Sequence, residues 1–415
     1  EAFKERLDIM REGLFYGYKT EKLDKQIAKK LFGGDHEISI SRLEKYAACA
    51  YAHFLTYGLQ LKERRQFELG AADYGSLFHA SISHFFELLE KRHLNWREIT
   101  DTQRNQLVEE SVAKAMEEYQ TTVFDSSARN KSMAGRIRRM TDRTLWALGC
   151  QWEHGAYEKT WHELDFGRAG GNGVTLPVEE GLELSLRGRI DRVDFAEEDG
   201  SLYVKVIDYK SGSTKLDLGK VYYGLQLQLA VYLDAAVELE QKKHPGKQVE
   251  PAGVFYYHID DPMLDQEEDE TDEAWGRRML KALRMDGLVN ADRKVVELLD
   301  RVLEDGTTSD VIPVGKKKDG SYTSYSKVAS PEQFDVIRTY TRKKVREIGE
   351  GIFSGNVKIS PYQRDGATAC AYCEYQGICG FDQKIQGYEY RKLKGMDTEL
   401  LMKAMQEITQ SDQKE

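Results

Sequence analysis

Two neighbouring segments with the alternation of β-strands constrain the fold of this chain most. Between Leu182 and Ile190 apolar and polar residues alternate strictly, as in a strand with one buried face. After a turn at residues 198–200, the apolar run from Leu202 to Asp208 predicts a second strand, so the two segments form an antiparallel hairpin. The apolar parity changes between Asp191 and Val193, which predicts a bulge or bend in the first strand.

Helical patterns on both sides of this hairpin place the chain in the α/β class. Apolar residues recur with helical spacing in five segments, which are residues 74–90, 101–160, 222–240, 275–303 (two helices) and 331–355. A further helix is expected after Ser39, because Ser41 followed by Glu44 has the spacing of a capping box. A strand pattern over residues 253–259 and a hairpin pattern over residues 311–328 complete the expected elements.

One elaborated domain is expected over residues 36–395, because no linker divides the chain into compact halves. The polar residues 1–35 are interpreted as a connecting segment from an upstream region, since the chain begins without Met, and residues 396–415 as a C-terminal helical tail. No apolar run approaches the roughly 18 residues that a bilayer span requires, so we expect no contact with a membrane.

The two strands of the hairpin carry two carboxylates and a lysine. Asp208 and Lys210 share one face of their strand, and Asp191 of the preceding antiparallel strand can lie close to both. Two carboxylates offer the oxygen ligands that Mg²⁺ or Mn²⁺ prefers, and a lysine beside them can orient a water and offset negative charge. This set suits metal-assisted phosphodiester hydrolysis. An Asp-x-Lys tripeptide alone is more often an ion pair at the end of a sheet.

Two further patterns favour the catalytic interpretation. Gly188 precedes Asp191 with the spacing G-x-x-D, where the missing side chain lets a backbone or ligand approach closely. Gln228 and Tyr232 place an amide and a phenol on one face of a helix, a pair that alone is usually an ordinary amphipathic edge. Together G-x-x-D, D-Y-K and Q-x-x-x-Y, in this order, resemble the motifs of the RecB-type branch of the PD-(D/E)XK nucleases.

The resemblance implies a restriction-endonuclease-like core, a mixed central sheet flanked by helices, with helical insertions. It also implies that Asp191, Asp208 and the backbone carbonyl of Tyr209 bind a divalent metal and that Lys210 is catalytic. Ile190 stands where other branches of the superfamily have Pro, and RecB-type members commonly lack that Pro.

Four more residues take roles from the resemblance. The family has a Gly and a His at the head of a helix, here Gly75 and His79, and His79 would be a further metal ligand. By itself, a His on a Phe-rich helix is more often a core residue. Gln228 and Tyr232 match the motif that positions the DNA backbone or the lysine, and Glu163 is a candidate for the acid that often precedes G-x-x-D.

The cysteines form a second constellation. Cys370, Cys373 and Cys379 have the spacing C-x2-C-x5-C, and Cys49 lies far upstream. Such spacing predicts metal or cluster ligation, and four thiolates can hold either zinc or a [4Fe–4S] cluster. Cys150, in an apolar helical pattern, is interpreted as a buried core thiol.

The family resemblance favours the cluster, because certain RecB-type nucleases carry an iron–sulfur staple with one distant upstream cysteine. The staple would tie the first helix of the domain to its C-terminal end and close a loop of over three hundred residues. Over residues 36–395 the chain resembles the C-terminal nuclease region of the B-subunit family of AddAB helicase–nucleases.

That resemblance implies an exonuclease that acts on DNA ends in double-strand-break resection and recombinational repair. It implies a heterodimer with the partner A-subunit of the helicase–nuclease, a single strand fed to the site, cleavage of the 5′-terminated strand, and a cytoplasmic, nucleoid-associated location. Two alternatives stay open: a catalytically inactive DNA-binding or scaffold domain that keeps the fold and cluster, and a stand-alone exonuclease of the CRISPR-adaptation type.

The net charge of −10 seems to argue against a DNA partner. Residues 260–273, however, contain nine carboxylates and no basic residue, so the other 401 residues are nearly neutral. Basic residues gather at 129–143, 316–318 and 338–346. Such clusters are usually solvated faces, and near a phosphodiesterase site they become candidate contacts to the DNA backbone.

Overall fold

The computed structural model describes residues 2–19, 22–32, 37–62, 70–119, 128–167, 174–179, 182–265 and 269–411. Its main sheet contains β1 (Ile38–Ser39), β2 (Lys159–Phe166), β3 (Val174–Glu179), β4 (Leu182–Glu198), β5 (Ser201–Lys210), β6 (Gln248–His258), β7 (Asp286–Asn290) and β8 (Val328–Ala329). The strand order is β1-β4-β5-β6-β7-β8, with β2 and β3 both pairing with β4. A small second sheet, ordered β10-β9-β11, contains β9 (Tyr362–Arg364), β10 (Ala367–Thr368) and β11 (Arg391–Lys392).

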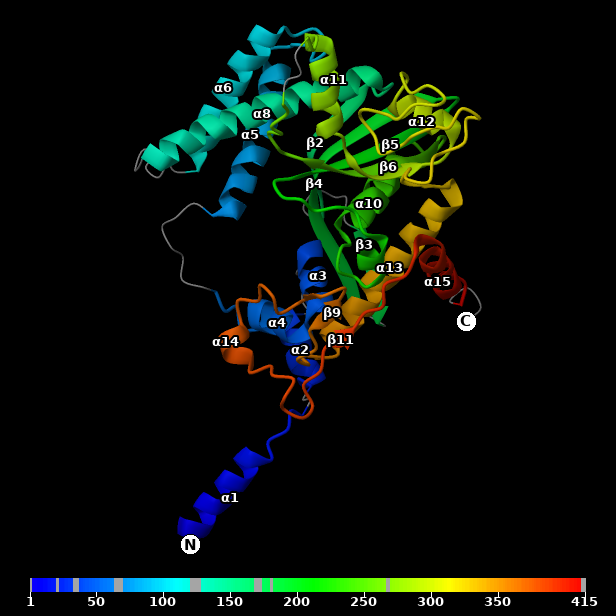
Figure 1. Ribbon diagram of the computed structural model, residues 1–415. Coiled ribbons are helices and arrows are strands. Elements are labelled where there is room, and N and C mark those ends of the chain that lie inside the picture. The colour runs from blue at the N-terminus through cyan, green and yellow to red at the C-terminus, as the bar shows by residue number, and fades with distance from the viewer. Residues whose placement is uncertain are drawn as a thin grey trace.

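The helices cover both faces of the main sheet (Figure 1). They are α1 (Ala2–Leu14), α2 (Lys25–Phe32), α3 (Ile40–Ala48), α4 (Ala50–His53), the π-helix η1 (Phe54–Gly58), α5 (Ala71–Lys91), α6 (Asp101–Glu118), α8 (Ala128–His154), α9 (Leu218–Tyr222), α10 (Gln228–Lys243), α11 (Asp272–Ala282), α12 (Arg293–Leu299), α13 (Pro331–Phe353), α14 (Gln376–Cys379) and α15 (Thr398–Ser411). None of these helices is both long and apolar enough to cross a membrane.

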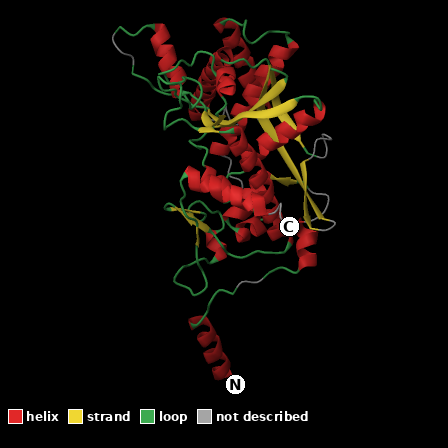
Figure 2. Ribbon diagram, turned by 90° about the vertical axis from the view of Figure 1, so that its right-hand side faces the viewer, coloured by secondary structure: helices red, strands yellow, loops and turns green. Residues whose placement is uncertain are grey.

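Two hydrophobic cores lie on opposite faces of the sheet. Helices α3, α10, α13 and α15 contribute to one core, and α5, α6, α8, α11 and α12 contribute to the other. The sheet is mixed, because β4 and β5 are antiparallel whereas β5 and β6 are parallel. Figure 2 shows this sheet edge-on among the helices, with α1 standing apart from them. The expected α/β architecture, a mixed sheet flanked by helices, is therefore confirmed.

Segments on both sides of residues 36–395 pack onto the body of the domain. Ala28 and Phe32 of α2, within the expected connecting segment, are buried in the same core as β4. Leu401 and Met405 of α15, within the expected tail, are buried there too. Helices α2 and α15 therefore contribute apolar surface to the fold.

Strands β4 and β5 form the hairpin that the alternation predicts, from Arg192 opposite Ile207 to Glu198 opposite Ser201. Leu184, Leu186 and Ile190 share one core with Val193 and Phe195, so the parity of the core-facing residues does change within β4. The pairing of β4 with β2 and with β5 shows no register shift, so no extra residue is inserted there.

The structure differs from four local expectations. The helix expected over 222–240 begins only at Gln228, because Gly224 (φ 77°) turns the chain after α9. The segment 275–303 contains β7 besides its two helices, and five residues are too few to show an alternation clearly. Residues 311–328 form isolated bridges instead of paired strands.

The fourth concerns the capping box expected at the start of α3. The helix begins at Ile40 with Ser39 as its N-cap, and the Ser39 side chain makes no capping hydrogen bond. Glu44 therefore lies inside the helix, beyond the first turn. Its carboxylate caps a different helix, α10.

A buried ion cluster stabilises the β4–β5 hairpin. Asp194 Oδ1 lies 2.6 Å from Arg192 Nε, and Asp194 Oδ2 lies 2.8 Å from Lys205 Nζ of β5. The Arg192 guanidinium also lies 5.2 Å from the ring centroid of Trp96 and 5.1 Å from that of Trp152. Burial alone would raise the pKa of Asp194, but the two cations lower it to about 2.

We predict that Asp194→Asn strongly destabilises the fold, because Arg192 and Lys205 would be left as buried cations without a counter-charge. Removing one partner of a buried ion pair costs about 3–5 kcal/mol in the free energy of unfolding, which urea denaturation measures. Glu297→Gln is the control, since the Arg293–Glu297 pair is exposed and should contribute less than about 1 kcal/mol. Equal stability of Asp194→Asn and the control would contradict this prediction.

Candidate active site

Asp191 and Asp208 lie together because the hairpin ends there. The last β4–β5 register pair is Arg192 opposite Ile207, and the two aspartates are the next residues beyond it. Asp191 Oδ2 accepts a hydrogen bond from the backbone N–H of Tyr209, at 2.7 Å. Both carboxylates are buried, with Asp208 only 1% exposed.

His79 reaches this pair from α5, on the neighbouring helical layer. Its Nδ1 lies 3.4 Å from Asp191 Oδ1, and its Nε2 lies 3.0 Å from the backbone carbonyl oxygen of Tyr209. The carbonyl oxygen accepts a hydrogen bond from Nε2–H, and the Asp191 carboxylate accepts one from Nδ1–H when the imidazole is protonated. The histidine is thus packed against two of the ligands that the sequence predicts.

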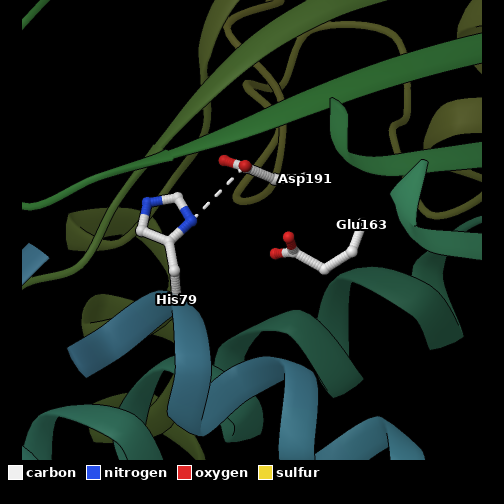
Figure 3. A group of neighbouring side chains, drawn as sticks. All are labelled: His79, Glu163 and Asp191. Carbon is white, nitrogen blue, oxygen red and sulfur yellow. Dashed lines mark ion pairs between the residues drawn. The ribbon is translucent and has the colours of Figure 1, made fainter. Parts of the chain in front are cut away.

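Glu163 completes the group from β2. Figure 3 shows His79, Glu163 and Asp191 turned toward one another, from a helix and two strands. One possible ligand atom from each lies within 4.8 Å of the other two, and among the described residues this is the only such group of three or more His, Cys, Asp or Glu residues. Glu163 has φ 53°, a left-handed conformation that is rare for a non-glycine residue and is found preferentially at functional sites.

Arg189, two residues before Asp191 on β4, pairs with two acids of β2. Its guanidinium lies 3.2 Å from Glu163 Oε2 and 2.9 Å from Asp165 Oδ1. Arg189, Glu163, His79 and Lys210 all line an open pocket of about 650 Å³ at this edge of the sheet. Glu163, His79 and Lys210 therefore face a space that a substrate can enter.

The electrostatics of the site reflect crowded, buried acids. Burial, and then the charge of Asp191, raise the pKa of Asp208 to about 7, although Lys210 opposes the shift. Burial and Asp191 also raise the pKa of Glu163. For His79 burial alone would lower the pKa, but its hydrogen bond to Asp191 and the surrounding acids raise it. A divalent cation would relieve this repulsion, so the donor set of carboxylates, imidazole and carbonyl fits such an ion.

Lys210 is held between an acid and an amide. Its Nζ lies 2.6 Å from Asp208 Oδ2 and donates to Gln228 Oε1 at 2.9 Å. Gln228 in turn donates from Nε2 to Tyr232 Oη at 3.0 Å, which orients the amide. The structure therefore brings the D-Y-K and Q-x-x-x-Y motifs into one hydrogen-bonded chain.

The missing side chain of Gly188 makes room for neighbouring side chains and not for a ligand. A Cβ atom at this position would lie 2.6 Å from the ring of Phe166 and 3.1 Å from the ring of Tyr232. The close approach predicted for this glycine is made by two aromatic side chains. The glycine thereby lets Phe166 and Tyr232 pack closely against β4.

The four cysteines expected as ligands line one small cavity. Cys49, between α3 and α4, lies there with Cys370 and Cys373, between β10 and α14, and with Cys379, the last residue of α14, around a space of about 20 Å³. Among the described residues the cysteines do not form a group of three sulfurs within 4.8 Å of one another. Cys150 lies apart, packed against the core that contains α8, and burial raises its pKa to about 11.

The three predicted basic clusters differ in whether their side chains are exposed or used in contacts within the fold. Arg338 and Arg342 of α13 both contact Asp234 of α10, so they are used within the fold. Lys316 is buried, whereas Lys317 is exposed. On α8 the described basic side chains stay exposed in the cluster of Arg136, Arg138 and Arg139. The side chains of residues 129 and 131 lie outside the described part of the structure.

Comparison with known proteins agrees with this geometry. The family model described as the PD-(D/E)XK nuclease superfamily matches residues 37–380. The chain belongs to this superfamily. It is 42% identical over 400 residues to the B-subunit of the ATP-dependent helicase/deoxyribonuclease of Lachnoclostridium phytofermentans, which covers 95% of this chain and 34% of that protein.

A second relative with the same description, from Alkaliphilus metalliredigens, is 35% identical over 412 residues, or 99% of this chain and 35% of its own length. The chain thus spans about a third of the length of the curated relatives it matches. The superfamily that the motifs predict is confirmed over most of the chain.

Two features of the site were hard to find from sequence. Glu163 is hard to place from sequence, because its position depends on an irregular backbone within β2. The sequence pattern assigns Glu44 to the cap of its own helix, whereas its carboxylate accepts hydrogen bonds from Leu227 and Gln228. Its partners lie 183 residues away or more, and no local pattern reports such a contact.

We predict that binding of Mn²⁺ weakens as the pH falls. Asp208, with a pKa raised to about 7, must lose its proton to bind a cation, and its ionised fraction falls about tenfold between pH 8 and pH 6. The dissociation constant, measured by calorimetry, should therefore rise at least about tenfold over that interval. Asp208→Asn should abolish most of this dependence, and equal affinities of the unsubstituted protein at the two pH values would contradict the assignment.

The same shift predicts how the stability of the metal-free protein depends on pH. The folded pKa of Asp208 lies above its unfolded value of about 4, so the folded chain binds more protons between those values. The stability contributed by this group is therefore complete below pH 4 and is lost as the pH rises toward 7. Added Mn²⁺ should raise the melting temperature clearly at pH 8 and little at pH 5, and an equal rise at both would contradict this.

Proposed function

We propose that this chain is a DNA nuclease that hydrolyses phosphodiesters with Mg²⁺ or Mn²⁺. The observation that carries the proposal is the convergence of Asp191, Asp208, Glu163 and His79 beside Lys210, at the edge of an open pocket. Crowded acids with raised pKa values have no structural benefit without a cation. The relatives named as parts of a helicase/deoxyribonuclease support the same chemistry.

Each group has a role that follows from its position. Asp191, Asp208, His79 and the carbonyl oxygen of Tyr209 are the proposed metal ligands, and Glu163 is a fifth candidate. A bound divalent cation would supply Lewis acidity at the scissile phosphate and lower the pKa of an attacking water. The ligand carboxylates orient that water.

Lys210 and its partners act beside the ligands. The Lys210 ammonium lies where it can donate to the water or to a phosphate oxygen and offset the charge that develops in the transition state. Gln228 fixes the direction of Nζ, and Tyr232 fixes the amide of Gln228. The proposed substrate is a single strand of DNA, whose phosphates would reach Lys210 through the open pocket.

We propose further that Cys49, Cys370, Cys373 and Cys379 hold a [4Fe–4S] cluster. Four thiols around one cavity fit a shared inorganic group. The resemblance to RecB-type nucleases that carry an iron–sulfur staple favours the cluster over zinc. Its role would be to tie α3 to the C-terminal segment.

In the cell the chain is proposed to act within a helicase–nuclease heterodimer with an A-subunit. This follows from the description of its relatives as B-subunits, over about a third of their length. The complex would resect DNA double-strand ends for recombinational repair, and this site would cut the 5′-terminated strand as an exonuclease in the nucleoid. A stand-alone exonuclease of the CRISPR-adaptation type is disfavoured, because the curated relatives carry another description.

The alternative of a catalytically inactive DNA-binding scaffold predicts the same fold and a different response to mutation. We predict that Asp208→Asn lowers Mg²⁺-dependent degradation of linear DNA by at least about 10³-fold, because it removes a charged metal ligand. The matched control is Asp199→Asn at the opposite end of the same hairpin, where the side chain contacts only Lys294 at the surface. Degradation at equal rates by Asp208→Asn and the control would support the scaffold.

The cluster has its own test. Protein purified without oxygen should contain about four iron and four sulfide per chain. Cys49→Ser should lose most of this iron, whereas Cys150→Ser should keep it, because Cys150 is remote from the cavity. Stoichiometric zinc without iron in the unsubstituted protein would overturn the cluster and leave a zinc site.

A further inference from the structure

Helix α3 lies between the cysteine-lined cavity and the helix that carries Gln228. The side chain of Glu44, on α3, points to that helix. Its Oε1 accepts hydrogen bonds from the backbone N–H of Leu227 at 2.6 Å and from that of Gln228 at 3.1 Å. These are the first amides of α10, and Leu227, the N-cap residue, has no side-chain acceptor for them. Glu44 therefore supplies from another helix the cap that α10 lacks.

The capped residue is the one that contacts the lysine. The backbone of Gln228 is fixed by Glu44, and its side-chain amide is fixed by Tyr232. Its Oε1 accepts the hydrogen bond from Lys210 Nζ at 2.9 Å. A shift of the first turn of α10 would therefore move the oxygen that aims the Lys210 ammonium.

Glu44 also acts through its charge. Burial raises the pKa of Glu44, and the hydrogen bonds from Leu227 and Gln228 together with the charge of Lys210 oppose that shift. The carboxylate thus lies close enough to Lys210 to interact with it electrostatically. A negative charge at the N-terminus of α10 is also favoured by the helix dipole.

The opposite side of α3 contacts the cysteine-bearing segment. Lys45, next to Glu44, lies 2.6 Å from Glu374, the residue after Cys373. The carbonyl of Ala47 accepts a hydrogen bond from the Arg391 guanidinium, and Cys49 directly follows the helix. Neighbouring residues of one short helix thus join the cysteine segment to α10.

We propose that Glu44 is a positioning residue for catalysis, which sets the place of Lys210 through the backbone and side chain of Gln228. Because Glu44 lies on α3, the position of Lys210 also depends on how the cysteine-bearing segment packs against α3. Glu44 touches neither metal ligands nor substrate, so its effect is on the alignment of the ammonium group. The inference rests on the proposed nuclease function.

Three variants test it, in the protein purified with any partner protein that accompanies it. Glu44→Ala should lower kcat about 10- to 100-fold and change KM less than about threefold, because misplacement of a reacting group by an ångström costs rate without loss of binding. Glu44→Gln keeps an acceptor oxygen and should retain kcat within about threefold. Ser330→Ala, the control, removes a comparable helix cap from α13 and should leave kcat unchanged.

Amide hydrogen exchange gives a second readout that needs no activity. Glu44→Ala should speed exchange in the peptide over residues 225–233, whereas Ser330→Ala should not. Unchanged exchange there, or a kcat no lower than that of the control, overturns the inference. If the unsubstituted protein and Asp208→Asn are equally inactive, the proposed nuclease function fails, and the exchange result alone then decides whether Glu44 orders the start of α10.

Discussion

The enforced proximity of two buried carboxylates is the constraint on which the active site depends. The antiparallel pairing of β4 with β5 brings Asp191 and Asp208 next to each other. Burial, and then repulsion by the charge of Asp191, raise the pKa of Asp208 to about 7. The ionised pair therefore destabilises the metal-free hairpin, and the proposed divalent cation would offset this repulsion.

The remaining groups are arranged around that pair from separate elements. Helix α5 brings His79, β2 brings Glu163 by an unusual backbone angle, and α10 brings Gln228 to Lys210. The ion cluster of Arg192, Asp194 and Lys205 begins directly after Asp191 and pairs buried opposite charges. In β4 the proposed metal ligand Asp191 is therefore followed closely by Arg192 and Asp194, which form a buried ion pair.

The sequence predicts the elements and motifs that follow from local patterns, and it does not predict contacts between residues that are far apart in the chain. The hairpin and its D-x-K end follow from alternation, and the family motifs added His79, Gln228 and Tyr232, which the structure brings together. Glu163 depends on a left-handed residue inside a strand, which no propensity reports. Glu44 has the spacing of a capping residue for its own helix, α3. Its carboxylate instead caps α10, because the backbone amide of Leu227, 183 residues away, has no side-chain acceptor within α10.

We propose that the Asp191–Asp208 pair binds a divalent metal, and anomalous diffraction from crystals of the protein soaked in Mn²⁺ is the decisive experiment. We expect one strong anomalous peak bounded by Asp191, Asp208, His79 and the carbonyl oxygen of Tyr209. No peak there, at a Mn²⁺ concentration that supports DNA cleavage, would contradict it.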